Sequence, residues 1–545
     1  MQLALLVTLL LSQNPESMQK LHALPFTEVE IRDAFWGPRI RKNSHKTLPH
    51  SIRECESTGR IANFAVAGGL EQGEFQGIYF NDSDVYKMLE GASYTLAGDR
   101  DPELEARIDE IIHKIASAQQ PDGYLNSYYT LVAPEGRWSK LWDKHELYCA
   151  GHLFEAAVAH FRATGKRSLL DVAIKFADHI DRTFGPGKKR GVPGHEEIEL
   201  ALIKLWRVTG EERYLELARF FLDERGRERD ERREYMQAHL PVREQTQIAG
   251  HAVRAMYLYS GVADLAGITR EQTLADTMER IWRDVTERKM YVTGGIGPSA
   301  RNEGFTVAYD LPNESAYAET CASIGMALWN HRLLLLHGEG RFADVLERVL
   351  YNGLLAGVSL DAEKFFYVNP LASRGAHHRK PWYGCACCPT NLVRFLPSLG
   401  GYVYAYSEDG IWVTLYVASK ARVKLPSGQV ELTQETRYPW SGEVELRVEP
   451  HEPAEFGLNL RIPGWCEGAG CKVNGVAVDA SAVRDGYLQI RRRWNSGDRV
   501  ELDLPMEIRR VQAHPRVEAD RGRIALMRGP LVYCLEAADN GGRVR

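Results

Sequence analysis

The spacing of apolar residues changes near residue 401 and divides this chain of 545 residues into two unlike parts. Before that point apolar residues recur every three or four positions. In residues 145–162 they form a stripe along one face of a predicted helix. In residues 198–208 they lie on almost every side of another predicted helix. Beyond residue 401 they alternate with polar residues, as in residues 456–462 and 500–504. We therefore expect a helical domain followed by a β domain.

Glycines punctuate the helical part at irregular intervals. Each of six glycines follows a run of periodic apolar residues, and most precede a new amphipathic run, such as residues 214–222. Glycine ends a helix readily because it adopts the left-handed conformation of the C′ position without strain. We predict six helical hairpins closed into an α/α toroid, with an irregular helical domain as the alternative, since the uneven intervals exclude a solenoid. The glycines are Gly98, Gly165, Gly210, Gly267, Gly338 and Gly400.

The alternating part of the chain predicts a β-sandwich, because short apolar runs such as residues 411–417 lie between turn-forming residues. Residues 522–535 also have the pattern of strands, but about 35 residues are too few for an independent sandwich. We therefore expect four segments. They are a leader or start of chain at residues 1–25, a helical domain at 26–400, a β-sandwich at 401–508 and the start of a second, truncated sandwich at 509–545.

Charge and hydropathy argue against two classes of partner. The 68 basic and 73 acidic residues give a net charge of −5 without a block of Lys and Arg alone, so we expect no nucleic acid. No apolar run approaches the roughly 18 residues of a membrane span, so we expect no membrane insertion. Residues 3–11 have the length of a signal-peptide core, but no Lys or Arg precedes them and no small-residue cleavage site follows. A cytoplasmic location is favoured, and a secreted or periplasmic one is the alternative if residues 1–20 are a signal peptide.

Three of the nine cysteines fall within residues 385–388, which is unsuited to disulfides and typical of metal or thiolate chemistry. Adjacent cysteines do not fit a regular zinc knuckle, but Cys387 and Cys388 could approach one metal from an irregular turn. Further ligands would come from elsewhere, and Glu319 and Cys321 are candidates. Because residues i and i+2 do not share a helix face, this pair should lie at a helix start or in an extended piece. Buried inert thiols and a redox sensor remain the alternatives.

A long loop rich in Gly and Pro, residues 294–313, contains one isolated acid, Glu303. Loops of this kind across the mouth of a toroid commonly carry function. His145, His195 and His251 each stand at the predicted start of a helix, where they could face one rim and bind a polyol. The alternatives are a solvated surface glutamate and three structural histidines.

At these residues the chain resembles the bacterial β-L-arabinofuranosidases of glycoside hydrolase family 127. The resemblance extends from about residue 24 to the end of the chain. Its most specific elements are the loop 294–313, Glu319-Thr320-Cys321 and Cys385-Ala386-Cys387-Cys388-Pro389, and residues 145–152 and 365–370 support it. It implies an (α/α)6 barrel followed by two β-sandwiches.

The resemblance further implies a retaining hydrolase whose cysteine nucleophile is bound to zinc. Cys387 would be the nucleophile and Glu303 the acid/base. The Zn²⁺ ligands would be Glu319, Cys321, Cys387 and Cys388. The sugar would contact His145, His195, His251 and Tyr367. Such a metal is useful because a zinc-bound thiol is deprotonated, whereas a free thiol with a pKa of roughly 8.5 is mostly protonated at neutral pH.

Other functions stay open at this point. The same chemistry could act on another pectin-derived or branched sugar. A sugar epimerase on an α/α toroid would need no zinc, and a zinc-stabilised carbohydrate-binding protein would show no turnover. The expected partner in each case is an oligosaccharide or glycoside, and a homodimer is also open.

Overall fold

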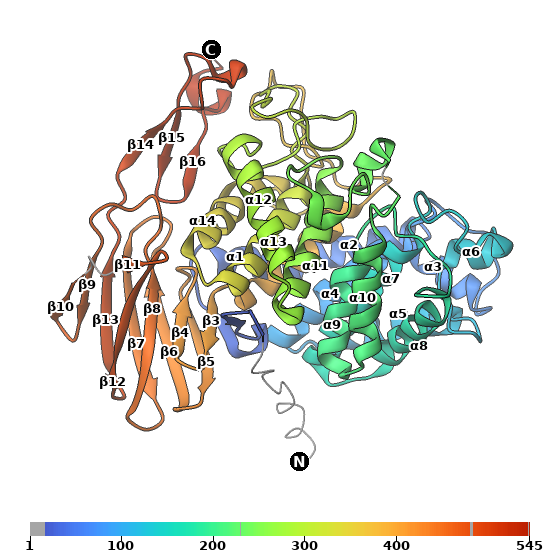
Figure 1. Cartoon of the computed structure of the whole chain (residues 1–545), viewed down its shortest axis with the longest axis horizontal. Helices are drawn as coiled ribbons and strands as arrows, with labels where there is room; N and C mark the ends of the chain where they lie inside the picture. The colour runs from blue at the N-terminus through green and yellow to red at the C-terminus, as the bar shows by residue number, and fades with distance from the viewer. Residues whose placement is uncertain (1–16, 229, 480–482, 543, 545) are drawn as a thin grey trace.

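Helices occupy one side of the molecule and β-sheets the other in the computed structural model (Figure 1), so the predicted order of a helical part followed by a β part is confirmed. The structure describes residues 17–228, 230–479, 483–542 and 544. The apolar run at residues 3–11 lies outside these ranges. Among the described residues, every helix is too short or too polar to cross a lipid bilayer.

Six helices form a closed ring. They are α4 (Asp82–Gly98), α7 (Glu146–Thr164), α9 (Ile198–Thr209), α11 (Ala252–Thr269), α13 (Thr320–His337) and α15 (Cys387–Phe395). Each packs on the next, and α15 packs again on α4, which gives the helical part the form of a barrel. Ring helices are buried on nearly all sides because neighbours surround them; in α13 every residue except the last is buried.

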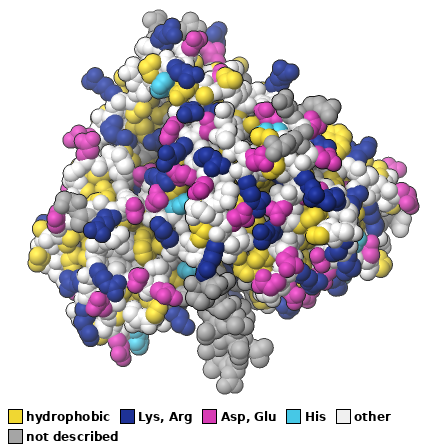
Figure 2. All heavy atoms as spheres, in the orientation of Figure 1, with side chains coloured by type: hydrophobic (Ala, Val, Ile, Leu, Met, Phe, Trp, Pro, Cys, Tyr) yellow, Lys and Arg dark blue, Asp and Glu magenta, His cyan; other side chains and the backbone are white. Residues whose placement is uncertain are grey.

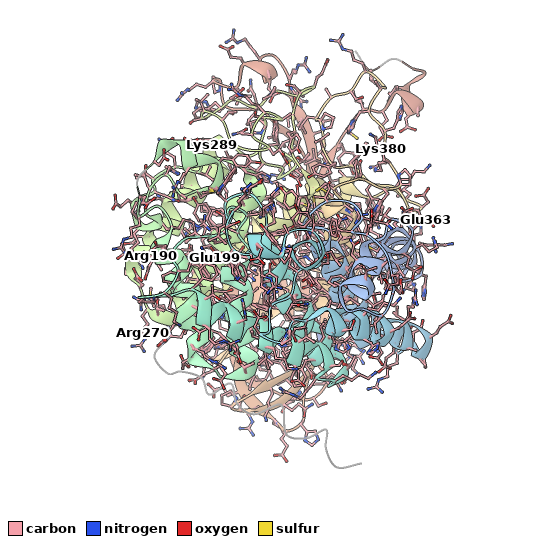
Figure 3. The ribbon with its side chains drawn as sticks, turned by 90° about the vertical axis from the view of Figure 1, so that its right-hand side faces the viewer. Arg190, Glu199, Arg270, Lys289, Glu363 and Lys380 are labelled. Carbon is pink, nitrogen blue, oxygen red and sulfur yellow. The ribbon has the colours of Figure 1, made fainter. Side chains whose placement is uncertain are left out.

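The remaining helices lie around the ring or at its ends. α5, α8, α10, α12 and α14 each pack on the ring helix that precedes them in the chain. Figure 3 faces the helical part: the buried Glu199 of α9 lies near the middle of the view, and Arg190 and Arg270 lie near its edge. The bounds are α1 (Trp36–Lys42), α2 (Leu48–Ser57), α3 (Arg60–Ala67), α5 (Pro102–Ala118), α6 (Ser127–Leu131), α8 (Ser168–Thr183), α10 (Glu212–Glu224), α12 (Gln272–Arg288) and α14 (Gly340–Arg348).

Most of the predicted glycine helix ends are found. Gly165, Gly210 and Gly338 cap α7, α9 and α13 in the left-handed conformation, with φ of 75°, 72° and 68°. Gly98 is the last residue of α4. These glycines allow each helix to stop and the chain to turn into the next one.

The prediction that a helix ends at Gly267 is wrong, because α11 continues to Thr269 and has Arg270 as its C-cap. Gly267 instead allows close packing: a Cβ there would lie 3.4 Å from Gln19 Cβ and 3.4 Å from Leu336 Cδ1. The predicted end at Gly400 is also displaced, since this residue lies inside a 3₁₀ segment, Leu396–Tyr402.

Two large sheets make up most of the β part. One has the strand order β1-β3-β4-β8-β12-β11 and the other β10-β9-β13-β7-β6-β5-β2. Pairing is antiparallel throughout except between β4 and β8. The bounds are β1 (His22–Ala23), β2 (Val29–Ile31), β3 (Tyr404–Ser407), β4 (Gly410–Val413), β5 (Ser419–Leu425), β6 (Gly428–Thr436), β7 (Glu443–Pro450), β8 (Ala454–Arg461), β9 (Gly470–Val473), β10 (Val476–Val478), β11 (Val483–Arg484), β12 (Tyr487–Trp494) and β13 (Asp498–Asp503).

The segment before the helices contributes the end strands β1 and β2. His22 pairs with Tyr406 of β3, and Val29 pairs with Ala421 of β5. The predicted boundaries place β1 in the leader and β2 in the helical domain, because strands of two or three residues carry no periodic signal.

A third sheet follows, made of β14 (Ile508–Val511), β15 (Ala525–Arg528) and β16 (Leu531–Tyr533). Strands predicted within residues 522–535 are therefore present. Asn352 ties this sheet to the helical part, because its amide donates to the carbonyl of Pro530 over 2.9 Å and its Oδ1 accepts from Val532 N over 2.8 Å.

Candidate functional site

The four predicted metal ligands stand at the N-terminal ends of two ring helices. Cys387 and Cys388 begin α15, and Pro389 fits there because residues of the first turn need no backbone N–H. Glu319 is the N-cap of α13, and Cys321 lies in its first turn. The expectation that this i, i+2 pair lies at a helix start is confirmed. Both helix dipoles present their positive ends to the same place, which favours anionic ligands.

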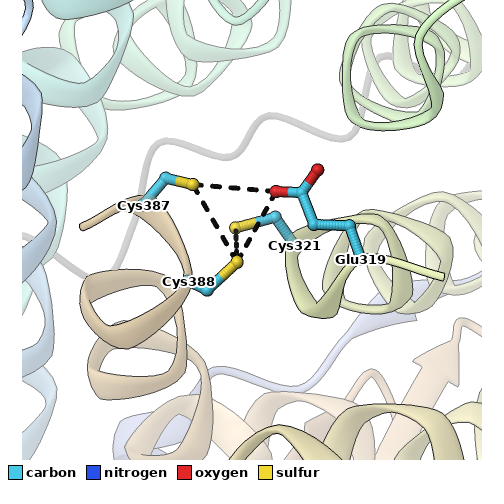
Figure 4. Close-up of side chains that lie close together, drawn as sticks. All are labelled: Glu319, Cys321, Cys387 and Cys388. Atoms are coloured by element: carbon cyan, nitrogen blue, oxygen red, sulfur yellow. Dashed lines mark hydrogen bonds between the residues drawn. The ribbon is translucent and has the colours of Figure 1, made fainter. Parts of the chain in front are cut away.

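These four side chains converge on one point (Figure 4). Cys321 Sγ lies 3.3 Å from Cys388 Sγ, and Cys387 Sγ lies 3.9 Å from Cys388 Sγ. Oε1 of Glu319 lies 3.6 Å from Cys387 Sγ and 3.5 Å from Cys388 Sγ. All four ligand atoms lie within 4.8 Å of one another, so the cluster could hold a metal ion.

Two further properties of the cluster fit a cation. Oε2 of Glu319 is buried and has no hydrogen-bond partner among the described residues. Burial, together with the neighbouring thiols, holds the pKa of this carboxyl well above its usual range. A bound cation would compensate that cost, and three sulfur ligands with one carboxylate oxygen suit a thiophilic ion of tetrahedral geometry such as zinc.

Glu303 is presented to the same space by a strained loop. Its φ is 48°, a conformation that costs free energy for a residue with a side chain and is common at functional sites. The backbone is fixed by Ala252 N, which donates to the carbonyl of Glu303 over 3.0 Å. Oε2 of Glu303 lies 3.5 Å from His251 Nε2 and accepts a bond from the Tyr317 hydroxyl over 3.0 Å. The His251 hydrogen bond is the main cause of a lowered pKa for Glu303.

The three predicted histidines lie side by side. The ring centroid of His195 is 5.5 Å from that of His145 and 5.7 Å from that of His251. His145 precedes α7 with φ of 56°, and its ring stacks on Phe80. Since Glu303, Glu319 and His251 have ligand atoms within 4.8 Å of one another, the histidines, the acid and the cysteine cluster form one site.

Tyr367 lies between the cysteines. Its hydroxyl is 3.2 Å from Cys387 Sγ and 3.8 Å from Cys385 Sγ. Its carbonyl accepts a bond from Thr320 N over 2.9 Å, which links this loop to the start of α13. All nine predicted site residues are thus found together, and Cys385 lies beside the cluster without belonging to the group of four.

Sequence reasoning missed two residues of this site. Tyr317 contacts Glu303 directly. Arg254, in the first turn of α11, is buried, donates to the carbonyl of Gly194 and covers the ring of Tyr235 at 4.4 Å. The signals were the positions of these residues, two before Glu319 and three after His251, which place them at the same helix ends.

A second group of acids and histidine lies in the core of the ring: His152, Glu155 and Glu197. Two cations already contact Glu155, namely Lys204 and Arg394, the latter at 2.6 Å. Nδ1 of His152 lies 3.1 Å from Oε1 of Glu197. Because Glu155 is already paired with two cations, and burial and the nearby Glu155 hold the pKa of Glu197 well above its usual range, we interpret this group as a buried ion-pair network.

The molecular surface is mixed in charge. On the face shown in Figure 2, basic and acidic side chains are interspersed over both parts of the molecule. That face carries no continuous basic patch of the kind that binds nucleic acid.

Comparisons with known proteins agree from residue 28 to residue 545. The family profile described as "Beta-L-arabinofuranosidase, GH127 catalytic domain" matches residues 28–401, the GH127 middle domain matches 410–506 and the family 127 C-terminal domain matches 508–545. The non-reducing end β-L-arabinofuranosidase of Bifidobacterium longum subsp. longum is 41% identical over 525 residues, covering 88% of this chain and 79% of that protein.

Solved structures give the same result. A GH127 β-L-arabinofuranosidase from Geobacillus stearothermophilus T6 is 47% identical with a TM-score of 0.92, over 94% of this chain and 87% of that one. Another GH127 β-arabinofuranosidase is 46% identical with a TM-score of 0.91, over 96% and 86%. The chain therefore belongs to glycoside hydrolase family 127, as the motifs predicted, and is a glycoside hydrolase.

Proposed function

We propose that the protein releases terminal β-L-arabinofuranosyl residues with retention of anomeric configuration. One observation carries the mechanism: the thiol of Cys387 stands in a closed cluster with Glu319, Cys321 and Cys388, and Glu303 lies beside that cluster. The sugar is proposed from the names of the relatives, which are β-L-arabinofuranosidases at 41% and 47% identity.

We propose zinc as the metal, held by Glu319, Cys321, Cys387 and Cys388. The buried, unpartnered Glu319 Oε2 and the three thiols support this choice. Bound zinc would keep these thiols deprotonated at neutral pH, and so supply a nucleophilic sulfur.

The residues of the chain then divide the reaction into two steps. Cys387 Sγ attacks the anomeric carbon, a C–S bond forms, the glycosidic C–O bond breaks, and Glu303 donates its proton to the departing oxygen. In the second step Glu303 takes a proton from water, whose oxygen attacks the same carbon and releases Cys387. Two inversions give retention. His145, His195, His251 and Tyr367 would contact the sugar.

Hydrolysis of 4-nitrophenyl β-L-arabinofuranoside, beside the α-anomer and other pentofuranosides, tests this function. We expect turnover of the β-L-arabinofuranoside, one zinc per chain in protein purified without added metal, and a methyl glycoside of retained configuration when methanol is present. If only a different glycoside were hydrolysed, the proposed sugar would be wrong. Full activity after exhaustive chelation would contradict the zinc-thiolate mechanism.

Three further predictions go beyond the described geometry. We propose that the closed ring is an (α/α)6 barrel and that the two large sheets form a sandwich, which the packing of the ring helices and the alternating burial along β5 and β13 support. A cytoplasmic location is proposed because a catalytic thiolate at Cys387, beside the thiols of Cys321 and Cys388, risks oxidation outside the cell. N-terminal sequencing from the native host tests it, and light scattering tests the homodimer.

A further inference from the structure

Backbone groups determine which ring nitrogen of His145 and His195 carries the proton. Nδ1 of His145 faces the carbonyl oxygen of Asp143, and Nδ1 of His195 lies 3.0 Å from the carbonyl oxygen of Glu196. A carbonyl oxygen only accepts hydrogen bonds, so Nδ1 must be the donor in both rings. In the neutral form of each ring, Nε2 is then unprotonated and can only accept a hydrogen bond.

His251 has the opposite arrangement. As the N-cap of α11, its Nδ1 accepts bonds from Val253 N over 3.1 Å and from Arg254 N over 3.4 Å. A backbone N–H only donates, so Nδ1 is unprotonated and the proton of the neutral ring is on Nε2. This nitrogen lies 3.5 Å from Oε2 of Glu303. His251 is thus a donor directed at the acid, and the helix cap fixes it in that role.

The three rings are neutral at physiological pH, so these assignments hold under working conditions. Burial lowers the pKa of each histidine, in the case of His145 to about 3. The guanidinium of Arg254 acts in the same direction on all three, since it opposes a second positive charge nearby.

We propose that Nε2 of His145 and Nε2 of His195 each accept a hydrogen bond from a hydroxyl group of the glycone. We further propose that His251 donates a hydrogen bond to Glu303 and so positions it. This inference rests on the function proposed above and adds a selection rule to it. The ring centroids of His145 and His195 lie 5.5 Å apart, so both rings can contact one pentofuranose. Sugars whose hydroxyls are blocked by methyl or acetyl groups cannot donate, and the site would reject them.

Binding of unreactive ligands tests the rule without interference from chemistry. We would measure inhibition constants of 1,4-anhydro-L-arabinitol and of analogues in which one hydroxyl is replaced by hydrogen or by fluorine. Fluorine is close to hydroxyl in size but cannot donate. At two positions we expect hydrogen and fluorine to weaken binding alike, each by about tenfold, and the remaining position to tolerate fluorine better.

Single variants assign the two positions. In His195→Phe the loss at one position should disappear while the loss at the other remains, and His145→Phe should show the converse. Fluorine analogues that bind as well as the parent compound would overturn the acceptor assignment alone. Failure of every arabinose-derived ligand to bind, with no hydrolysis of arabinofuranosides, would overturn the proposed function as well.

A spectroscopic readout is independent of whether those variants fold. Long-range ¹H–¹⁵N correlation spectra of protein labelled on histidine distinguish the two neutral ring forms directly. We expect protonated Nδ1 for His145 and His195 and protonated Nε2 for His251. Protonated Nε2 in His145 or His195 would overturn the inference.

Discussion

The hydroxyl of Tyr317 donates a hydrogen bond of 3.0 Å to Oε2 of Glu303. Together with the stronger contribution of His251, this bond lowers the pKa of Glu303 because it stabilises the ionised form. A proton donor must be protonated in the free enzyme, so kcat/KM should fall as pH rises through this pKa. In Tyr317→Phe the pKa of Glu303 rises, and we expect the alkaline limb of the kcat/KM profile to move to higher pH.

Tyr309, in the loop 294–313, provides the control. Its ring stacks on that of His514 with centroids 4.4 Å apart, and it is not among the groups that shift the pKa of Glu303. Tyr309→Phe should leave the alkaline limb unchanged. A limb that stays in place in Tyr317→Phe, or moves to lower pH, would show that another group donates the proton.

Cys387 and Cys388 are neighbours in the cluster but should differ when each is replaced by serine. Cys387→Ser should lower kcat/KM by roughly a thousandfold or more even when zinc is retained, because a hydroxyl is a far weaker nucleophile than a thiolate. Cys388→Ser should act through loss of metal, so its activity should follow zinc content and partly return at high zinc. Activity and elemental analysis of the same preparations provide the measurement.

Cys385→Ser is the matched change in the same segment. Its thiol lies 3.8 Å from the Tyr367 hydroxyl and outside the group of four ligands. We expect zinc content and most of the activity to remain. Substantial activity in Cys387→Ser, or a sugar found covalently bound to a carboxylate by mass spectrometry, would contradict the thiolate mechanism. Either result would favour a mechanism with two carboxylates.

Gly304 sets the position of the acid next to it. A Cβ at this residue would lie 1.8 Å from the carbonyl oxygen of Gly250, so Gly304→Ala must push the loop that carries Glu303 away from His251. A displacement of about 1 Å can cost roughly a hundredfold in rate, and we expect a loss of that order in kcat/KM. Gly98→Ala, where a Cβ meets nothing within 4 Å, is the control and should keep full activity. Equal activities of the two variants would contradict this role.

Arg394 supports the helix that begins with Cys387. Its guanidinium lies 2.9 Å from Glu90 and 2.6 Å from Glu155, and all three side chains are buried. Arg394→Met removes the cation paired with buried Glu90 and one of the two cations paired with buried Glu155, which should lower the free energy of unfolding by about 3–5 kcal/mol. Denaturant unfolding gives this value, and zinc content should fall with it because α15 holds two of the ligands.

The exposed pair of Arg491 and Glu455 is the comparison. Its atoms lie 3.3 Å apart, but the side chains are 58% and 62% exposed. Arg491→Met should change the free energy of unfolding by at most about 1 kcal/mol, because water screens such pairs. If both arginine variants lowered the free energy of unfolding by similar amounts, burial would not explain the contribution of the Arg394 ion pairs to stability.

Part of this structure follows from local pattern, and part does not. Periodicity was sufficient for α7 and α9, because most of their residues are apolar and face neighbouring helices. Gly267 was misjudged because its role is a close approach to Gln19 and Leu336, two residues far away in sequence. A single glycine has the same local signature in both roles.

The candidate site divides in the same way. The cysteine cluster was found because adjacent thiols at a proline violate the usual spacing, and the i, i+2 pair of Glu319 and Cys321 had to begin a helix. Tyr317 and Arg254 were missed. A lone tyrosine or arginine belongs to no pattern, and its part in the site depends on which distant segment folds against it.

Because His22 pairs with Tyr406 and Val29 pairs with Ala421, the two large sheets can be completed only late in synthesis. At about 5–20 residues per second, the ribosome releases β1 and β2 on the order of 20 to 80 s before their partner strands emerge. The whole helical ring is translated in that interval and can close around its own core. Until then the backbone groups of β1 and β2 lack their partner strands. We therefore expect a chaperone to act on the segment that contains β1 and β2.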